Sequence, residues 1–318
     1  MNNSLRNRSE MKNKMLIRNE MGDDFDEGSS IMSNSSNTAP NNGAFLSDTI
    51  KIQSEFNSLY IQQVPESFLQ IDGIDEDVFV KIQPHKKYSL WLKDFCESDK
   101  GLHDIFQTLR SSEPEDYLEI RIYSNGGYIT ELQTLYSTIK EMFYGRISTY
   151  LDNYGYSCGG FAFLFGDKRV AYEFSEFMVH QATFGVYGTQ YSNEVQHNFI
   201  QKQTKRFSNR VMKEFFTKEE IDSMFTGKDY WFDAEEMARR NISTHTVVDG
   251  IELLSSDYLE LLEWEEENPD QDREEFFKLL SEREMSEEEV VEEEEVVEEV
   301  KPIKKVTRKR KAKVKKDE

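Results

Sequence analysis

The sequence predicts an α/β domain with a mostly parallel sheet, flanked by two polar extensions. Three observations predict it: stretches that alternate apolar and polar residues like strands, amphipathic helical stretches that follow them, and glycine-rich turns in between. Strand–turn–helix units that recur along a chain need crossover connections, and these place successive strands parallel in one sheet. The units occur between residues 75 and 255, where we expect the folded domain.

The elements of this domain are predicted in order from the apolar pattern. They are a strand over 118–123, a helix over 129–143, a strand over 146–151, a small-residue turn over 155–160 leading into a buried helix up to 165, short strands over 170–172 and 177–179, and helices over 194–216 and 218–225. Each helix therefore follows a strand, as a parallel sheet requires.

The two ends of the chain have a different composition. Residues 1–70 are rich in Asn, Ser and Asp and are predicted to be a disordered extension, either a plain one or a removable pro-segment or docking arm. Residues 256–285 predict amphipathic acidic helices, broken near Asn268 and Pro269. Residues 286–318 hold an acidic block and then ten basic residues between 301 and 316, which predicts a disordered tail. This tail could solvate the chain, tether a partner or contact nucleic acid.

Composition excludes several classes of function. The 318 residues include 39 basic and 61 acidic ones, and a net charge of −22 argues against nucleic-acid binding by anything but the basic tail. There is no apolar run of membrane-spanning length and no apolar stretch at the start, so we expect neither a membrane span nor a secretory signal. Two cysteines fit a reducing compartment, which predicts the cytoplasm, or the host cytoplasm if the protein is viral.

Three positions after predicted strands offer groups useful in acyl transfer. Ser157 begins a helix, where free backbone amides and the helix dipole favour a developing oxyanion. His180 ends a strand beside a loop, a common place for a general base, and Asp229 lies among aromatic residues. Each also has an ordinary structural interpretation: a helix cap, a partly buried histidine and a turn carboxylate.

Gly126 and Gly127 end a strand and could supply bare amides for an oxyanion hole, or form only a tight turn. No His or Cys pair has metal-ligand spacing, and no phosphate-binding or dinucleotide-binding glycine motif occurs. The sequence therefore predicts no metal, no cofactor and no intrinsic ATPase activity.

Several of these segments, in this order, resemble the ClpP family of serine peptidases in the crotonase-like superfamily, over roughly residues 85–250. The matching segments are Ile122-Tyr123-Ser124-Asn125-Gly126-Gly127-Tyr128-Ile129-Thr130, Ile147-Ser148-Thr149, Ser157-Cys158-Gly159-Gly160-Phe161, Met178-Val179-His180-Gln181 and Asp229-Tyr230-Trp231-Phe232-Asp233-Ala234-Glu235-Glu236. The resemblance implies a ClpP/crotonase-like fold of repeated strand-strand-helix units.

The resemblance also implies roles for single residues. Ser157 would be the nucleophile, His180 the general base and Asp229 the orienting carboxylate of a serine endopeptidase. The amides of Gly127 and Cys158 would form the oxyanion hole, and Gly126 and Tyr128 would border the substrate strand. A different alignment places Gly159 at the nucleophile position and gives an inactive protein; we prefer Ser157 because that register is gapless from the strand onward.

The resemblance further implies partners. A homo-oligomeric ring would cleave unfolded polypeptides fed by an AAA+ unfoldase, or act on a capsid or scaffold partner as phage-type maturation proteases do. Alternatives are a catalytically impaired structural subunit, a crotonase-type acyl-CoA enzyme that does not need Ser157, and an enzyme that uses Cys158 as nucleophile.

Overall fold

The computed structural model describes residues 49–71, 78–96, 99 and 101–283. The chain divides into two compact units, the first made of residues 1–68 and 81–260 and the second of residues 69–80 and 261–318. The first unit contains every residue predicted for the site. Most of the predicted N-terminal extension and the whole predicted tail over 286–318 lie outside the described residues.

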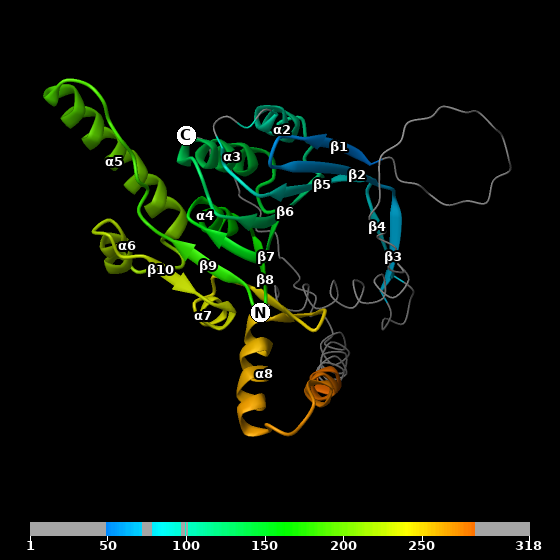
Figure 1. Cartoon of the computed structure of the whole chain (residues 1–318). Helices are drawn as coiled ribbons and strands as arrows, with labels where there is room; N and C mark the ends of the chain where they lie inside the picture. Colours follow the sequence, from blue (N-terminus) through cyan, green and yellow to red (C-terminus); the bar gives the residue numbers. More distant parts are fainter. Residues whose placement is uncertain (1–48, 72–77, 97–98, 100, 284–318) are drawn as a thin grey trace, which may run out of the picture. The chain divides into compact units, whose positions relative to one another are not determined.

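The first unit is built on a ten-stranded mixed sheet (Figure 1). Its strands are β1 (Ile50–Gln53), β2 (Ser58–Val64), β5 (His85–Leu92), β6 (Tyr117–Ser124), β7 (Ile147–Tyr156), β8 (Lys168–Tyr172), β9 (Glu176–Val179), β10 (Tyr230–Phe232), β11 (His245–Val248) and β12 (Ile251–Leu254). The order is β1-β2-β5-β6-β7-β8-β11-β12, and β5, β6, β7, β8 and β11 run parallel. The predicted α/β class with a parallel centre is confirmed. A separate two-stranded sheet is made of β3 (Ser67–Ile71) and β4 (Val78–Ile82).

Helices cover one face of this sheet. The named helices are α2 (Leu102–Leu109), α3 (Ile129–Met142), α4 (Cys158–Phe163), α5 (Gln190–Met212), α6 (Lys218–Met224), α7 (Ala234–Arg239) and α8 (Ser255–Glu267). Of these, α2, α3 and α4 lie against the sheet (Figure 1). In α3, Leu132, Leu135 and Ile139 share one side and are fully buried, as the predicted apolar stripe requires.

Strand β7 forks the sheet and thereby positions the candidate site. Its first half pairs with β8, where Tyr150 lies opposite Val170, and its second half pairs with β9, where Tyr156 lies opposite Met178. Strand β9 also pairs with β10. The ends of β7, β9 and β10 therefore meet on one side of the fork.

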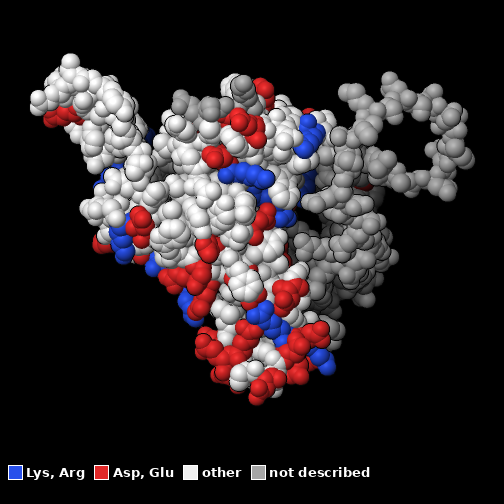
Figure 2. Space-filling model, viewed as in Figure 1, with Lys and Arg blue, Asp and Glu red and all other residues white. Residues whose placement is uncertain are grey.

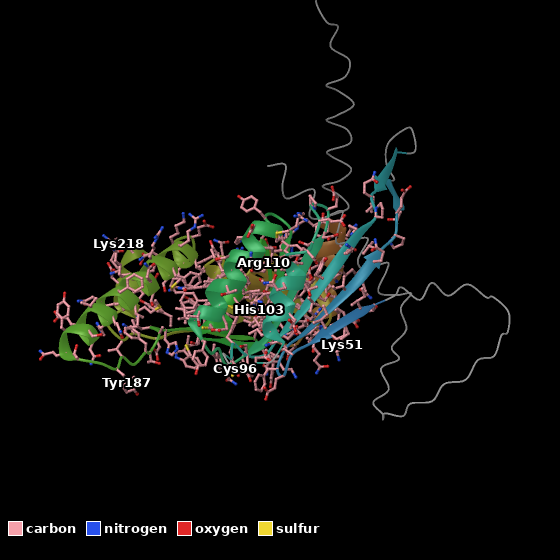
Figure 3. The ribbon with its side chains drawn as sticks, turned by 90° about the horizontal axis from the view of Figure 1, so that it is seen from above. Lys51, Cys96, His103, Arg110, Tyr187 and Lys218 are labelled. Atoms are coloured by element: carbon pink, nitrogen blue, oxygen red, sulfur yellow. The ribbon has the colours of Figure 1, made fainter. Side chains whose placement is uncertain are left out.

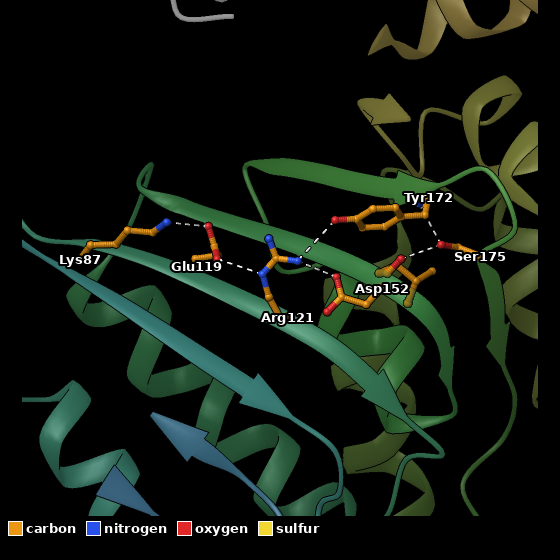
Figure 4. Close-up of polar contacts among 7 residues, drawn as sticks. Lys87, Glu119, Arg121, Asp152, Tyr172 and Ser175 are labelled. Atoms are coloured by element: carbon orange, nitrogen blue, oxygen red, sulfur yellow. Dashed lines mark hydrogen bonds and ion pairs between the residues drawn. The ribbon is translucent and has the colours of Figure 1, made fainter. Parts of the chain in front are cut away.

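The face of the sheet without these helices carries a row of charged side chains (Figure 4). Glu119 pairs with Lys87 at 2.9 Å and with Arg121 at 3.2 Å, and Arg121 also pairs with Asp152 at 2.8 Å. Burial by itself would raise the pKa of Glu119, but the two cations outweigh it and hold that pKa below its usual value. The row thus joins β5, β6 and β7 by side-chain contacts as well as backbone pairing.

Two predicted boundaries were wrong. Residues 50–64 were assigned to the extension, yet they form β1 and β2, because the apolar residues Leu59 and Ile61 alternate with polar ones and become buried against β5. Residues 155–160 were predicted to be a turn, yet Gly155 continues β7 and pairs with Phe177. Glycine is needed in this strand because α4 lies close: a Cβ at Gly155 would be 3.2 Å from the Gly159 backbone.

Helix α5 begins at Gln190, four residues before its predicted start, and it projects away from the sheet with Tyr187 near its tip (Figure 3). In the second unit, α8 ends at Glu267, just before the predicted break, and residues 273–283 are helical. The Trp264 and Phe276 rings pack there with centroids 5.8 Å apart. Acidic side chains gather over α8 and the helical residues after it, whereas the outer part of α5 has few charges (Figure 2).

Candidate active site

Ser157 lies at the junction of β7 and α4, where it caps the helix. Its backbone has φ 54° and ψ −119°, a left-handed conformation that a residue with a side chain rarely adopts. Its amide donates to the Met178 carbonyl at 2.9 Å, which ties the turn to β9. Strained backbone of this kind costs roughly 1–3 kcal/mol and is typical of functional turns.

His180 follows β9 and faces Ser157. The distance between the His180 Nε2 and the Ser157 Oγ is 2.9 Å, which is a hydrogen bond. This short distance follows from the pairing of Tyr156 with Met178. Ser157 directly follows Tyr156, and His180 lies two residues after Met178. The fork of the sheet therefore brings together the two groups that the sequence predicted as nucleophile and base.

Asp229 lies opposite His180, but its side chain makes no hydrogen bond to it. Tyr230 pairs with Val179 in the antiparallel ladder of β10 and β9, so the next residues outward are Asp229 and His180. Asp229 is exposed, and in the described part of the chain its carboxylate makes no hydrogen bond to His180. The ladder of β9 and β10 thus places Asp229 opposite His180, but no hydrogen bond between them completes a Ser-His-Asp triad.

The amides predicted for an oxyanion hole are close to Ser157. Cys158 is the first residue of α4, so its amide has no partner within the helix. The Phe95 amide donates to the Gly126 carbonyl, and the Phe95 carbonyl accepts from the Tyr128 amide. Among the described residues, this bridge leaves the amide of Gly127 without a backbone hydrogen bond. The Cys158 thiol donates to the Gly127 carbonyl at 3.2 Å, which brings the two residues together.

Gly126 and Tyr128 form the turn beside the serine. A Cβ at Gly126 would lie 2.7 Å from the Ser157 Cβ, so only glycine fits at this close approach. The Gly126 amide donates to the Ser124 Oγ at 3.1 Å and the Tyr128 amide to the Phe95 carbonyl at 2.6 Å. The carbonyls are used as well, since Gly126 accepts from the Phe95 amide and Tyr128 from the Leu132 amide, so the backbone groups of both residues hold the turn together.

The alternative nucleophiles lie in unsuitable places. Gly159 packs against β6, where a Cβ would be 2.9 Å from the Ser124 carbonyl oxygen. Burial, together with the carboxylates of Glu131 and Asp94, raises the pKa of the Cys158 thiol to about 12. A thiol with that pKa is protonated at neutral pH and is a poor nucleophile.

Asp94 is a nearby group that the sequence did not indicate. A Cβ at Gly127 would lie 2.9 Å from the Asp94 Oδ1, so this carboxylate adjoins the predicted oxyanion hole. Burial raises the pKa of Asp94, and the Asp99 carboxylate raises it further. No motif pointed to Asp94, because its position beside Gly127 follows from the long-range bridge between Phe95 and Gly127.

The residues that the structure describes hold neither a metal-binding cluster nor a membrane-spanning helix. No group of three or more His, Cys, Asp or Glu side chains there could hold a metal ion. No helix there has the length and apolar character to cross a bilayer.

A serine hydroxyl presented to an imidazole at a strand–helix junction of an α/β sheet is the arrangement found in serine hydrolases. Residues 97–242 match the family model for Clp protease. This part of the chain is therefore similar to a Clp protease domain, and the predicted resemblance to this family of peptidases is confirmed. Ser157, His180 and Asp229 all lie within the matched residues. No curated protein matches the chain.

Proposed function

We propose that this protein is a serine endopeptidase in which Ser157 is the nucleophile. The observation that supports it most is the 2.9 Å distance between the Ser157 Oγ and the His180 Nε2 at a strained strand–helix junction. A serine hydroxyl is a weak nucleophile until a positioned base accepts its proton, and a neutral imidazole at this distance can do so.

The reaction would proceed in two steps. His180 takes the hydroxyl proton while Ser157 attacks the peptide carbonyl, and the Gly127 and Cys158 amides donate to the resulting oxyanion. The imidazolium then returns the proton to the leaving amine, which gives an acyl-enzyme that water hydrolyses by the same route. Asp229 would accept from the His180 Nδ1 and stabilise the imidazolium, so its carboxylate has to turn toward the ring.

The proposed substrate is an unfolded polypeptide, and the proposed assembly is a homo-oligomeric ring that encloses the sites. An AAA+ unfoldase or a capsid scaffold would deliver the substrate, in the cytoplasm or the host cytoplasm. Their support is the match of residues 97–242 to the Clp protease family model.

A fluorophosphonate probe tests the nucleophile directly, because it reacts covalently with an activated serine. The purified wild-type protein should be labelled once per chain, and Ser157→Ala should abolish the label. Ser137→Ala is the matched control, since Ser137 is an exposed serine on α3 whose hydroxyl bonds only to the Gln133 carbonyl. A label that survives in Ser157→Ala, or that never forms, refutes the proposal.

One observation favours a second candidate, a catalytically impaired structural subunit. Among the described residues the Asp229 carboxylate makes no hydrogen bond to His180, and a base without its orienting partner is less effective. Assembly of the purified chain without any label from the probe, and without peptide turnover, would support this second function.

A further inference from the structure

Four aromatic side chains form a continuous row beside the candidate active site, and we call this row the aromatic strip. The ring centroids of Tyr123 and Tyr154 are 4.4 Å apart, those of Tyr154 and Tyr156 are 4.8 Å apart, and those of Tyr156 and Trp231 are 5.2 Å apart. The strip therefore crosses from β6 over β7 to β10. Its ends are open to solvent, with Tyr123 46% and Trp231 57% exposed.

The aromatic strip lies on the same face of the sheet as the catalytic groups. On β9, Phe177 packs its ring against Phe163 of α4, so the alternate residues Met178 and His180 belong to the opposite face. Trp231 pairs with Met178, and Tyr156 pairs with Met178 from the other side. Same-face residues two apart along a strand are separated by about 7 Å, and Tyr156 and Trp231 lie opposite Met178, so along the strand direction the strip begins about that distance from His180.

The rings of the strip are held in place before any ligand arrives. Tyr156 donates its hydroxyl to the Glu176 carboxylate, and this hydrogen bond and burial raise the pKa of Tyr156 to about 12. The Asn125 side-chain amide donates to the Tyr154 hydroxyl at 3.3 Å. Rings fixed in advance lose little conformational entropy when a ligand stacks on them.

We propose that the aromatic strip binds an aromatic side chain of the polypeptide substrate, about two residues from the scissile bond. The occupant follows from continuity: Tyr156 directly precedes Ser157 in the chain, so a polypeptide whose carbonyl reaches the Ser157 hydroxyl lies next to these rings. An extended peptide places alternate side chains about 7 Å apart, which matches the distance from His180 to the strip. Exposed aromatic rings without charge favour stacking with an aromatic partner. This inference rests on the proposed function, from which it takes the location of the substrate.

Peptide binding to the Ser157→Ala protein tests the strip without requiring turnover. The probes are two fluorescein-labelled, uncharged peptides of Ser, Gln and Ala that differ by a single Phe or Ser at the centre. Fluorescence anisotropy should show that the Phe peptide binds more tightly. Trp231→Ala should weaken binding of the Phe peptide about threefold to tenfold, the loss expected for one aromatic contact, and should leave the Ser peptide unchanged. Trp231→Phe should restore most of the difference.

Further variants guard against misfolding and against other occupants. Tyr123→Ala, at the opposite end of the strip, should weaken binding of the Phe peptide in the same direction, and Tyr144→Ala should not, because Tyr144 is 79% exposed outside the strip. Equal binding of the two peptides, or equal effects of Tyr144→Ala and Trp231→Ala, overturns the inference. A change in sedimentation of Trp231→Ala with unchanged peptide binding also overturns it, since the strip would then be a contact between copies.

The two proposals can fail separately. If the fluorophosphonate never labels Ser157 but the Phe peptide still depends on Trp231, then the nucleophile is wrong and the strip remains a peptide-binding site. If labelling succeeds and the peptide preference is missing, only the strip is rejected.

Discussion

Replacing Gly160 with alanine is expected to separate α4 from β9 and so to damage both stability and the site. A Cβ at Gly160 would lie 2.4 Å from the Met178 carbonyl oxygen and 3.1 Å from the Gly155 carbonyl oxygen. Ordinary contact begins near 3.4 Å, so the helix and the strand must move apart by about 1 Å in a close-packed interior. Overpacking of this kind costs about 1–3 kcal/mol, occasionally more, and the better helix propensity of alanine returns at most about 1 kcal/mol.

We therefore expect Gly160→Ala to lower the free energy of unfolding by about 2 kcal/mol. In urea this shifts the midpoint by about 0.7 M if the slope is about 3 kcal/mol per M. Because β9 carries His180, the same movement should slow fluorophosphonate labelling of Ser157 about a hundredfold, the effect expected for a 1 Å misplacement.

Gly185→Ala is the matched control, because its Cβ would meet nothing closer than a Tyr187 ring carbon at 3.8 Å. It should be neutral or slightly stabilising. If Gly160→Ala and Gly185→Ala unfold at the same urea concentration, the close approach of α4 to β9 is wrong.

Four further results are expected. Asp229→Asn should slow labelling of Ser157 at least about tenfold if the carboxylate orients His180, and an unchanged rate would remove Asp229 from the mechanism. Cys158 should react with iodoacetamide at pH 8 at least about a hundredfold more slowly in the folded protein than in urea, because a thiol with a pKa of about 12 is almost entirely protonated. Cys96 is the comparison thiol. Fast labelling of Cys158 in the folded protein would contradict its burial. Asp94→Asn should speed labelling about threefold or more by removing a negative charge beside the oxyanion, and a slower rate would show that this carboxylate supports the turn instead. Glu119→Gln should destabilise the protein by about 1–2 kcal/mol at pH 7. The lowered pKa of Glu119 means that its contribution is present above the unfolded value and is lost as the pH falls through the lower folded value, so the difference between the two proteins should shrink as the pH falls below the unfolded value in urea titrations; a constant difference would refute this.

The sequence determined the order of the central elements because their patterns are local. Apolar positions in α3 repeat at helical spacing and those in β6 alternate, so each stretch selects one regular structure by itself. Candidate residues Ser157 and His180 were identifiable for a related reason, since Ser157 stands at the start of a predicted helix and His180 directly after a predicted strand. Strands β1 and β2 were missed because they lie within a stretch whose overall composition is polar, and their pairing, β1 with β2 and β2 with β5, is long-range information.

Only the tertiary structure decided which distant residues meet. The fork of β7 sets the 2.9 Å contact between Ser157 and His180, and the ladder of β9 and β10 places Asp229 opposite His180 without joining them. The aromatic strip joins three strands that are far apart in the sequence, and no local pattern indicates it. The physical reason is that periodicity fixes which face of a strand a side chain takes, whereas strand order and register, set by long-range packing, fix its neighbours.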